Sequence, residues 1–476
     1  MDLIAILIAA AAVSFAAIRS PRWFWAAFAC SPTVLTIIAP LIGLDPDHIT
    51  LGSLQLRVWD TSAVGLLIGI LYHLRGQGLR PLLREPGGII LRLICGFLVV
   101  KVITAMLFRD TAATNVVANS LAGGSVAALG EIRDSFLAFF VPIYAIVTVR
   151  KQSARHMGMP ALFTVGIILL RGVTQIATTG TVWDSSAELR FINANEAVTL
   201  TILSFLLFFL SVKTTRFRAV FRCFACLGVV VALVANHRSQ WVATAVGLAV
   251  LSVLILFGKL TIGRRGLAAP ICIAVLVLLL VVASVTAFST VDIQILAGST
   301  GMQKRMLALF DPSQDANASW RQDLWRDRIA QVGDNWLWGR QLGDRQLSYA
   351  GNYWTSAPNH NAYVTAFELG GLTMLILLVL FWGTLARAAI QRLRIANSIS
   401  WQPALALGII AMCLGFGVAY DFPTIGPAIA TLLVLREPRR LVWGRDGRTL
   451  TRILDSSKTE LQRAVDVPAA ARIGSV

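Results

Sequence analysis

The chain has 476 residues, of which 56% are hydrophobic and only 14% are charged, and this balance excludes an assembly of soluble domains. The formal net charge is +17, but the basic residues stand between apolar segments, so they indicate membrane topology and give no support to nucleic-acid binding. Apolar runs long enough to cross a bilayer recur along almost the whole length, and the short alternating segments of a transmembrane barrel are absent. We therefore predict an all-α polytopic membrane protein whose surroundings are membrane lipids.

The apolar segments predict about 12–13 transmembrane helices. The first resembles the core of a signal peptide, but it has no basic region before it and is followed by Arg19 and Arg22, so we expect a retained helix. In chain order, the expected spans are 3–18, 24–44, 62–74, 88–108, 134–149, 159–179, 196–212, 219–236, 240–258, 267–288, 362–386, 402–420 and 423–435.

Basic residues alternate between the two ends of these spans. The loops on one side are rich in Lys and Arg, and the positive-inside rule assigns that side to the cytosol. The N-terminus is then expected outside and the C-terminus in the cytosol. The basic loops contain Arg19 and Arg22; Arg75, Arg80 and Arg84; Arg150, Lys151 and Arg155; Lys213, Arg216, Arg218 and Arg222; Lys259, Arg264 and Arg265; and Arg387, Arg392 and Arg394.

The chain is expected to form one transmembrane domain, 1–435, followed by a basic cytosolic tail, 436–476. One outer loop, 289–361, is far longer than the others, and a loop of that length is usually functional when it is ordered. In the tail, a stretch near 449–465 has the spacing of an amphipathic helix that lies on the membrane surface.

Inside the long loop, Ser319 and Gln322 have the spacing of a capping box and predict a helix from Ser319 to about Val332. The stretch 336–339, Trp-Leu-Trp-Gly, is typical of an aromatic turn at the membrane interface. The residues that would share one face of the loop helix are Arg321, Trp325, Arg328 and Val332.

Basic residues also occur in the outer loops and within the spans, against the positive-inside bias. Lys101 and Arg171 are two of those within spans. This excess favours an anionic ligand at the outer face, because the planar guanidinium group of arginine donates two parallel hydrogen bonds to a phosphate. Ion pairs with aspartates of the long loop are the alternative for most of these arginines.

Arg238 and Arg321 stand out from this set. Arg238 lies in a very short turn between two apolar spans, and charges kept at membrane depth tend to be functional. The alternative is a topology marker that extends to the lipid headgroups. Arg321 would lie in the first turn of its helix, where free backbone N–H groups add to phosphate binding and where an arginine is otherwise unfavourable.

His360 is one of five histidines and stands where the long loop meets the next apolar span. An imidazole at such a boundary suits a proton acceptor, whereas a hydrogen bond to loop backbone is the structural alternative. We expect Asn359 to cap the following helix and Asn361 to orient the ring.

Glu368 would lie about two turns inside the membrane on that following helix. A carboxylate at this depth needs a cation, and the candidates are Lys101, Arg171 or an outer-loop arginine. A structural ion pair and a contact with substrate are equally compatible with the sequence.

We predict no metal and no cofactor. Asp45 and Asp47 form an outer Asp-x-Asp that could hold a divalent cation on a diphosphate, but Pro46 between them is also common in turns. Walker, HExxH and serine-triad motifs are absent, and the outer histidines lack zinc-ligand spacing. Cys223 and Cys226 lie within an apolar span, where small buried thiols are the simpler interpretation.

Over roughly 196–435, these residues resemble the O-antigen ligase and polysaccharide polymerase superfamily, bacterial membrane glycosyltransferases that include the Wzy-type polymerases. His360 and Asn361, followed by Gly371, are similar to the H-N-x9-G signature of that family, although Met374 replaces the small residue or Tyr that often follows. The turn with Arg238 resembles the short outer turn of the family. The loop helix with Arg321 and the Gly-ending turn at 336–339 resemble its long outer loop.

The resemblance implies a GT-C-like fold and a metal-independent, inverting glycosyl transfer at the periplasmic face of the bacterial inner membrane. The donor would be a glycan on undecaprenyl diphosphate and the acceptor a sugar hydroxyl. His360 would take the acceptor proton or orient the hydroxyl, and Arg238 and Arg321 would stabilise the departing diphosphate. The candidate substrate-binding residues are Lys101, Arg171, Trp325, Arg328, Asn361, Tyr363 and Glu368.

Polymerisation of O-antigen or exopolysaccharide repeat units is the expected form of this transfer, because nothing specifies a lipid A core acceptor. An O-antigen ligase that uses such an acceptor is the alternative within the superfamily. A transporter or flippase for a lipid-linked glycan is the alternative from another class. A third is a metal-dependent GT-C enzyme that uses Asp45 and Asp47, and transfer that resists chelators would exclude it.

Overall fold

A computed structural model describes much of the chain, and all of its described residues belong to the first of two units, Met1–Leu435 and Arg436–Val476. The predicted span 267–288, the predicted tail helix 449–465, and Asp45 and Asp47 lie outside the described residues. The structure describes residues 2–41, 49–51, 54–56, 58–107, 139–149, 157–179, 191–213, 217–235, 237–256, 316–342, 348–350, 353–355, 359–395, 401–420, 422 and 425–435.

The described part is dominated by helices, most of which match the predicted spans to within a few residues. Five of them are long and apolar enough to cross a membrane, in α5, α7, α8, α10 and α14, so this is a helical membrane protein. The helices are α1 (Asp2–Arg19), α2 (Pro21–Leu41), α3 (Val58–Gln77), α4 (Arg80–Arg84), α5 (Gly88–Leu107), the apolar segment Phe139–Thr148, α7 (Gly158–Thr179), α8 (Ala194–Lys213), α9 (Arg218–Val234), α10 (Arg238–Leu256), α13 (Ala316–Val332), α14 (Ala362–Ile395), α15 (Trp401–Gly417) and α16 (Gly426–Val434).

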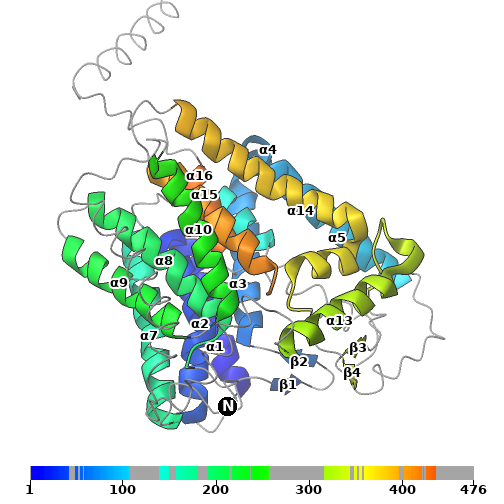
Figure 1. The fold of residues 1–476 in the computed structure, drawn as a ribbon, viewed down its shortest axis with the longest axis horizontal. Coiled ribbons are helices and arrows are strands. Elements are labelled where there is room, and N and C mark those ends of the chain that lie inside the picture. The colour runs from blue at the N-terminus through cyan, green and yellow to red at the C-terminus, as the bar shows by residue number, and fades with distance from the viewer. Residues whose placement is uncertain are drawn as a thin grey trace, which may run out of the picture. The chain divides into compact units, whose positions relative to one another are not determined.

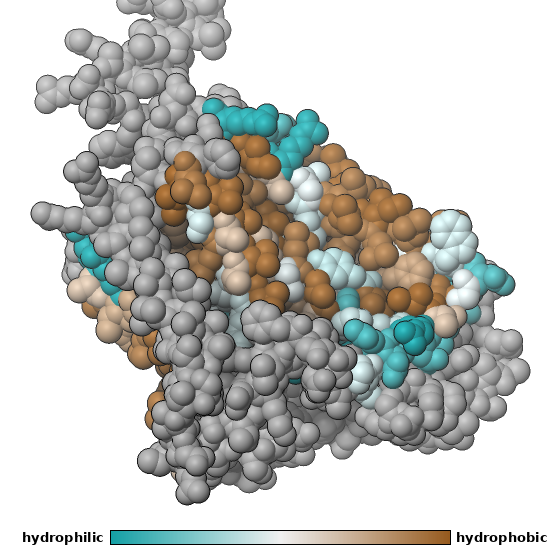
Figure 2. Space-filling view, viewed as in Figure 1, coloured by the Kyte–Doolittle hydropathy of each residue, from teal (hydrophilic) through white to brown (hydrophobic). Residues whose placement is uncertain are grey.

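Helix α8 lies at the centre of the packed helices. Its apolar window is 89% buried, whereas the windows of α5, α7 and α10 are only 33% buried. A helix that is apolar on all sides and enclosed by others forms a core, and α7, α9, α10 and α15 pack around it (Figure 1). Apolar side chains left outside gather along α14, as expected for a lipid-facing surface, while hydrophilic residues gather near α13 (Figure 2).

Two short antiparallel strand pairs were not predicted. Strand β1 (Ile49–Leu51) pairs with β2 (Leu54–Leu56), and β3 (Ser348–Ala350) pairs with β4 (Tyr353–Thr355). In the sequence, Gly-Ser and Gly-Asn separate the two members of each pair, and two-residue connections that begin with Gly favour hairpins. The local signal was therefore present, but each strand is too short to stand out from a loop.

Helix α14 is not the single continuous span that the sequence predicted over 362–386. Gly371 interrupts it with φ 61° and ψ −156°, so two helical pieces meet at a sharp break (Figure 1). The second piece, from Leu372 to Ile395, is about 36 Å long at 1.5 Å per residue and is long enough to cross a bilayer alone. Glu368 therefore belongs to a separate short helix, Ala362–Gly370, and does not lie two turns down a continuous span.

Candidate functional site

Helix α13 supplies the arginines of the candidate site, and it begins earlier than predicted. It starts at Ala316, so Ser319 lies inside the helix and is not its N-cap. Arg321 is consequently in the second turn, and the predicted contribution of free N–H groups at the helix N-terminus is wrong. The alanines at 316 and 318 favour the helix strongly enough to extend it upstream of the capping-box pattern. The predicted end at Val332 agrees with the structure.

The four residues that were predicted to share one face of α13 are all buried or in contact with other segments. Arg321 donates from Nη1 to the carbonyl of Ala419 at 3.2 Å, and Trp325 donates from its indole nitrogen to the carbonyl of Asn359 at 2.6 Å. Arg328 is fully buried, and Val332 is buried as well. Through these contacts α13 is held against two segments, the one that contains Ala419 after α15 and the one that contains Asn359 before α14.

Arg321 and His360 converge on one aromatic ring, that of Tyr420. The guanidinium carbon of Arg321 lies 5.2 Å from the ring centroid, within the range of a cation–π contact. The imidazole of His360 lies 5.6 Å from the same centroid, tilted by 59°. Tyr420 is itself held in place, because its carbonyl accepts the backbone N–H of Ala362 at 3.1 Å.

His360 has an unusual backbone and an unusual charge environment. Its φ of 48° is the only positive φ of a non-glycine residue in the described part of the chain, and such backbone strain concentrates at functional sites. Burial of the partly covered ring, and then the neighbouring positive charge of Arg321, lower the pKa of His360 to about 4. The imidazole is therefore neutral at physiological pH and can accept a proton or a hydrogen bond.

The two asparagines that flank His360 have different roles from those predicted. Asn361 is the helix cap, because its Oδ1 accepts the backbone N–H groups of Tyr363 at 2.9 Å and Val364 at 3.1 Å. Asn359 is buried and donates from Nδ2 to Oε2 of Glu368 at 2.5 Å. The cap is therefore Asn361 and not Asn359 as predicted, and the predicted orientation of the ring by Asn361 stays a prediction.

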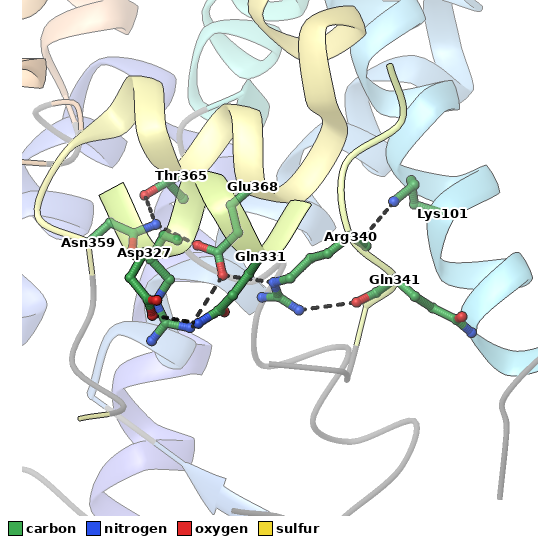
Figure 3. A network of polar contacts seen from close by, with 9 residues as sticks. Lys101, Asp327, Gln331, Arg340, Gln341, Asn359, Thr365 and Glu368 are labelled. Atoms are coloured by element: carbon green, nitrogen blue, oxygen red, sulfur yellow. Dashed lines mark hydrogen bonds and ion pairs between the residues drawn. The ribbon is translucent and has the colours of Figure 1, made fainter. Parts of the chain in front are cut away.

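Glu368 is buried and binds two arginines of the long outer loop (Figure 3). Nε of Arg340 donates to its Oε1 at 2.7 Å, and Nη1 of Arg328 lies 3.7 Å from the same oxygen. The described ion pairs of Glu368 therefore select the outer-loop arginines among the predicted partners. Because a buried carboxylate is costly unless it is paired, this cluster ties α13 and the loop to the short helix that follows His360.

Lys101 on α5 stabilises the turn that precedes Arg340. Its ammonium group donates to the carbonyls of Trp338 at 2.9 Å and Arg340 at 2.7 Å. The same turn closes the break in α14, since the carbonyl of Trp336 accepts the N–H of Leu372 at 2.8 Å. Lys101 thus supports the loop through two of its backbone carbonyls, and a contact between it and substrate stays a prediction.

Arg171 belongs to a second, partly buried ion pair in another part of the helical core. It pairs with Glu196 on α8, which also accepts the hydroxyl of Thr33 at 3.0 Å. Arg238 is the first residue of α10, and His237 beside it is buried against the carbonyl of Ile192 at 2.9 Å. The contacts described above join Arg321 to His360, whereas a place for Arg238 beside them stays a prediction.

Sequence reasoning missed Arg340 and Tyr420 as parts of this site. Arg340 follows Gly339, whose φ of 73° makes the tight turn that directs the arginine inward. Gly-Arg after two tryptophans was a detectable signal for such a turn. Tyr420 carries no comparable signal, because its role depends on α15 bringing it to the start of α14.

The described residues contain no group of three or more His, Cys, Asp or Glu side chains that could hold a metal ion. Chemically, the site combines a neutral imidazole, a guanidinium group beside it and a rigid, buried ionic support. The guanidinium can stabilise an anion, and the imidazole can accept a proton from a hydroxyl.

The chain matches no protein-family model and no curated protein. The resemblance to the O-antigen ligase and polymerase superfamily therefore depends only on the motifs of the sequence.

Proposed function

We propose that the protein is a metal-independent, inverting glycosyltransferase with a GT-C-like fold of about 12–13 transmembrane helices. It moves a glycan from undecaprenyl diphosphate to a sugar hydroxyl at the periplasmic face of the bacterial inner membrane. The convergence of Arg321 and the neutral imidazole of His360 on Tyr420 is the observation that carries the proposal. Polymerisation of repeat units is preferred to ligation onto lipid A core, because no described feature indicates that acceptor.

In this reaction the acceptor oxygen forms a bond to the anomeric carbon while the bond from that carbon to the diphosphate oxygen breaks. The diphosphate leaves with the electron pair, and Arg321 and Arg238 stabilise its charge. His360 receives the hydroxyl proton or aligns the hydroxyl by accepting its hydrogen bond. A bound diphosphate would offset the charge of Arg321, so the pKa of His360 would rise in the donor complex, which makes the imidazole a stronger base when it is needed.

Not all of the predicted substrate-binding residues suit a direct contact. Arg328 and Glu368 are buried in the ion cluster, and the Arg171–Glu196 pair lies elsewhere in the core, so these residues fit supporting roles better. The partly exposed side chains of Trp325 and Tyr363 are better placed to pack against a sugar or the lipid.

The test is transfer from a purified lipid-linked glycan in detergent or proteoliposomes, with products resolved as a ladder or as capped lipid A core. We expect His360→Ala, Arg321→Ala and Arg238→Ala each to reduce transfer by about 100-fold or more, because a positioned base and a charge on the leaving group are each worth that much. Arg326→Ala is the matched control, since this arginine is on α13 but its side chain is 82% exposed. Full activity of all three variants would contradict the proposal.

A flippase remains the alternative class because α14 is broken and a partly buried ion pair lies among the apolar helices, both of which occur in transporters. It requires movement of labelled lipid-linked glycan across a vesicle membrane without a new glycosidic bond. Product formation in vesicles that show no such movement would exclude it.

A further inference from the structure

Glu368 is the point at which three separate segments meet beside His360. Its Oε1 accepts a hydrogen bond from Arg340, in the turn after α13, and forms an ion pair with Arg328 of α13 itself. Its Oε2 accepts a hydrogen bond from the side-chain amide of Asn359, the residue directly before His360. Its backbone carbonyl also accepts the N–H of Arg340 at 2.9 Å. One side chain therefore connects the helix that carries Arg321 to the backbone that carries His360 (Figure 3).

The backbone at His360 needs such a connection. A left-handed φ is unfavourable for a residue with a side chain, so the surroundings must hold it. Asn361 fixes the side that follows His360, because it caps α14. On the preceding side, Asn359 is held by Glu368 through its side chain and by Trp325 through its carbonyl.

We propose that Glu368 is a positioning residue, whose buried carboxylate acts through Asn359 and the two loop arginines to hold His360 against Arg321 and Tyr420. The assignment rests on the glycosyl transfer proposed above, because it says which geometry that reaction uses. Glu368 itself does not contact the reacting atoms.

In Glu368→Gln, a purely electrostatic role and a positioning role of Glu368 predict opposite changes in the pKa of His360. Loss of one negative charge alone would stabilise the neutral imidazole further, so the pKa of His360 would stay low or fall. Loss of position would separate the ring from Arg321 and admit water, so the pKa would rise toward its ordinary value of about 6.5. Among the described residues, the titratable and charged groups of this corner are Arg321, Asp327 and Arg328 on α13, Arg340 in the turn, Tyr363 and Glu368 on α14, and Tyr420 after α15.

The experiment measures carbethoxylation of His360 by diethylpyrocarbonate from about pH 4.5 to 7.5, with peptide mapping by mass spectrometry, because the reagent attacks only neutral imidazole. In the wild-type protein the rate at His360 should be nearly constant across this range. In Glu368→Gln and in Asn359→Ala it should fall on acidification, with a midpoint nearer to 6.5. The same variants should lose about 100-fold in kcat, the usual effect of a displacement of about 1 Å, with much less change in KM for the donor.

Three controls keep the result interpretable. Glu196→Gln removes the buried carboxylate of the Arg171–Glu196 ion pair and should leave the pH dependence of His360 labelling unchanged. His73 and His237 are buried and should stay unlabelled in a folded protein. If they react in Glu368→Gln, that variant has unfolded, and Asn359→Ala, which keeps both arginine contacts, decides the test.

Unchanged labelling in a folded Glu368→Gln or in Asn359→Ala would overturn the proposal. The labelling needs no glycan, so it separates this inference from the proposed function. If the wild-type protein is active and the variants show no shift in the pH dependence of labelling, only the positioning role of Glu368 is contradicted. If the wild-type protein is inactive but the variants show the shift in the pH dependence of labelling, the transfer reaction is contradicted and Glu368 is still the residue that positions His360.

Discussion

A histidine beside an arginine is a poor base in the empty protein and a better one when an anion is bound. His360 combines burial with the charge of Arg321, and both lower its pKa. Ligand binding that brings negative charge to Arg321 reverses the second effect. In the proposed transfer, the residue pair would couple binding of an anionic donor to the basicity of the imidazole.

This coupling predicts the acid limb of the pH–rate profile. The profile of kcat/KM reports the free enzyme, so its acid limb should lie near pH 4, where His360 becomes protonated, and well below the pH of about 6.5 expected for an ordinary histidine. In Arg321→Gln one of the two causes is removed, so the limb should move upward even though the rate is lower. Arg326→Gln should leave the limb in place. A wild-type limb near 6.5 would contradict this assignment.

At the scale of elements, the break in α14 is a docking site for the loop. Gly371 and Gly339 both have positive φ, and the two turns approach so closely that only glycine fits at either position. A Cβ at Gly371 would lie 2.5 Å from the carbonyl oxygen of Trp336, which is backbone and cannot move aside. The close approach of the turn thus explains why this chain has glycine at the last position of the H-N-x9-G pattern.

We therefore expect Gly371→Ala to be strongly destabilising. The backbone of Gly371, at φ 61° and ψ −156°, is in a region occupied almost only by glycine and alone costs about 1–3 kcal/mol for a residue with a Cβ, and the clash with the turn adds to it. The effect is measured as the melting temperature in detergent, with unfolding monitored by light scattering from aggregates or by intrinsic tryptophan fluorescence. Gly383→Ala is the control, because a Cβ at this position of α14 meets nothing within 4 Å and alanine favours a helix. Equal melting temperatures for both variants would argue against a closed break at Gly371.

At the scale of the whole molecule, the alternation of basic loops defines two sides. The candidate site is built from α13 and the start of α14, which belong to the long loop and to its return to the membrane. The basic turn between α3 and α5 belongs to the other side by the same alternation. On this predicted topology, the basic loops of one face set the orientation, and the arginines of the candidate site lie at the other face.

Single cysteines in a cysteine-free background should reveal these two sides. We expect Arg326→Cys on α13 to react with a membrane-impermeant maleimide in spheroplasts, and Leu79→Cys, which is exposed next to α4, to react only after the membrane is permeabilised. Reaction of both cysteines in intact spheroplasts would refute the proposed orientation.

The sequence predicted the helical spans well because about 20 apolar residues in a row leave few alternatives. It failed where the outcome depends on contacts between distant segments. Glu368 selects Arg340 and Arg328, 28 and 40 residues away, and no local pattern distinguishes them from Lys101 or Arg171. The break at Gly371 had a signal in the pair Gly370–Gly371, but the apolar run around it has the composition of an uninterrupted helix.

The break in α14 also has a consequence for biosynthesis. In hydrocarbon, an unsatisfied backbone N–H costs several kcal/mol, and those of Leu372 and Thr373 are satisfied by carbonyls of Trp336 and Leu337. The ribosome makes that turn before it makes α14, so on the predicted topology the acceptors would already lie outside when the helix enters the bilayer. On that topology, the loop would have to cross the membrane before α14 could insert in its final form, and the order of translocation would be part of how this site is assembled.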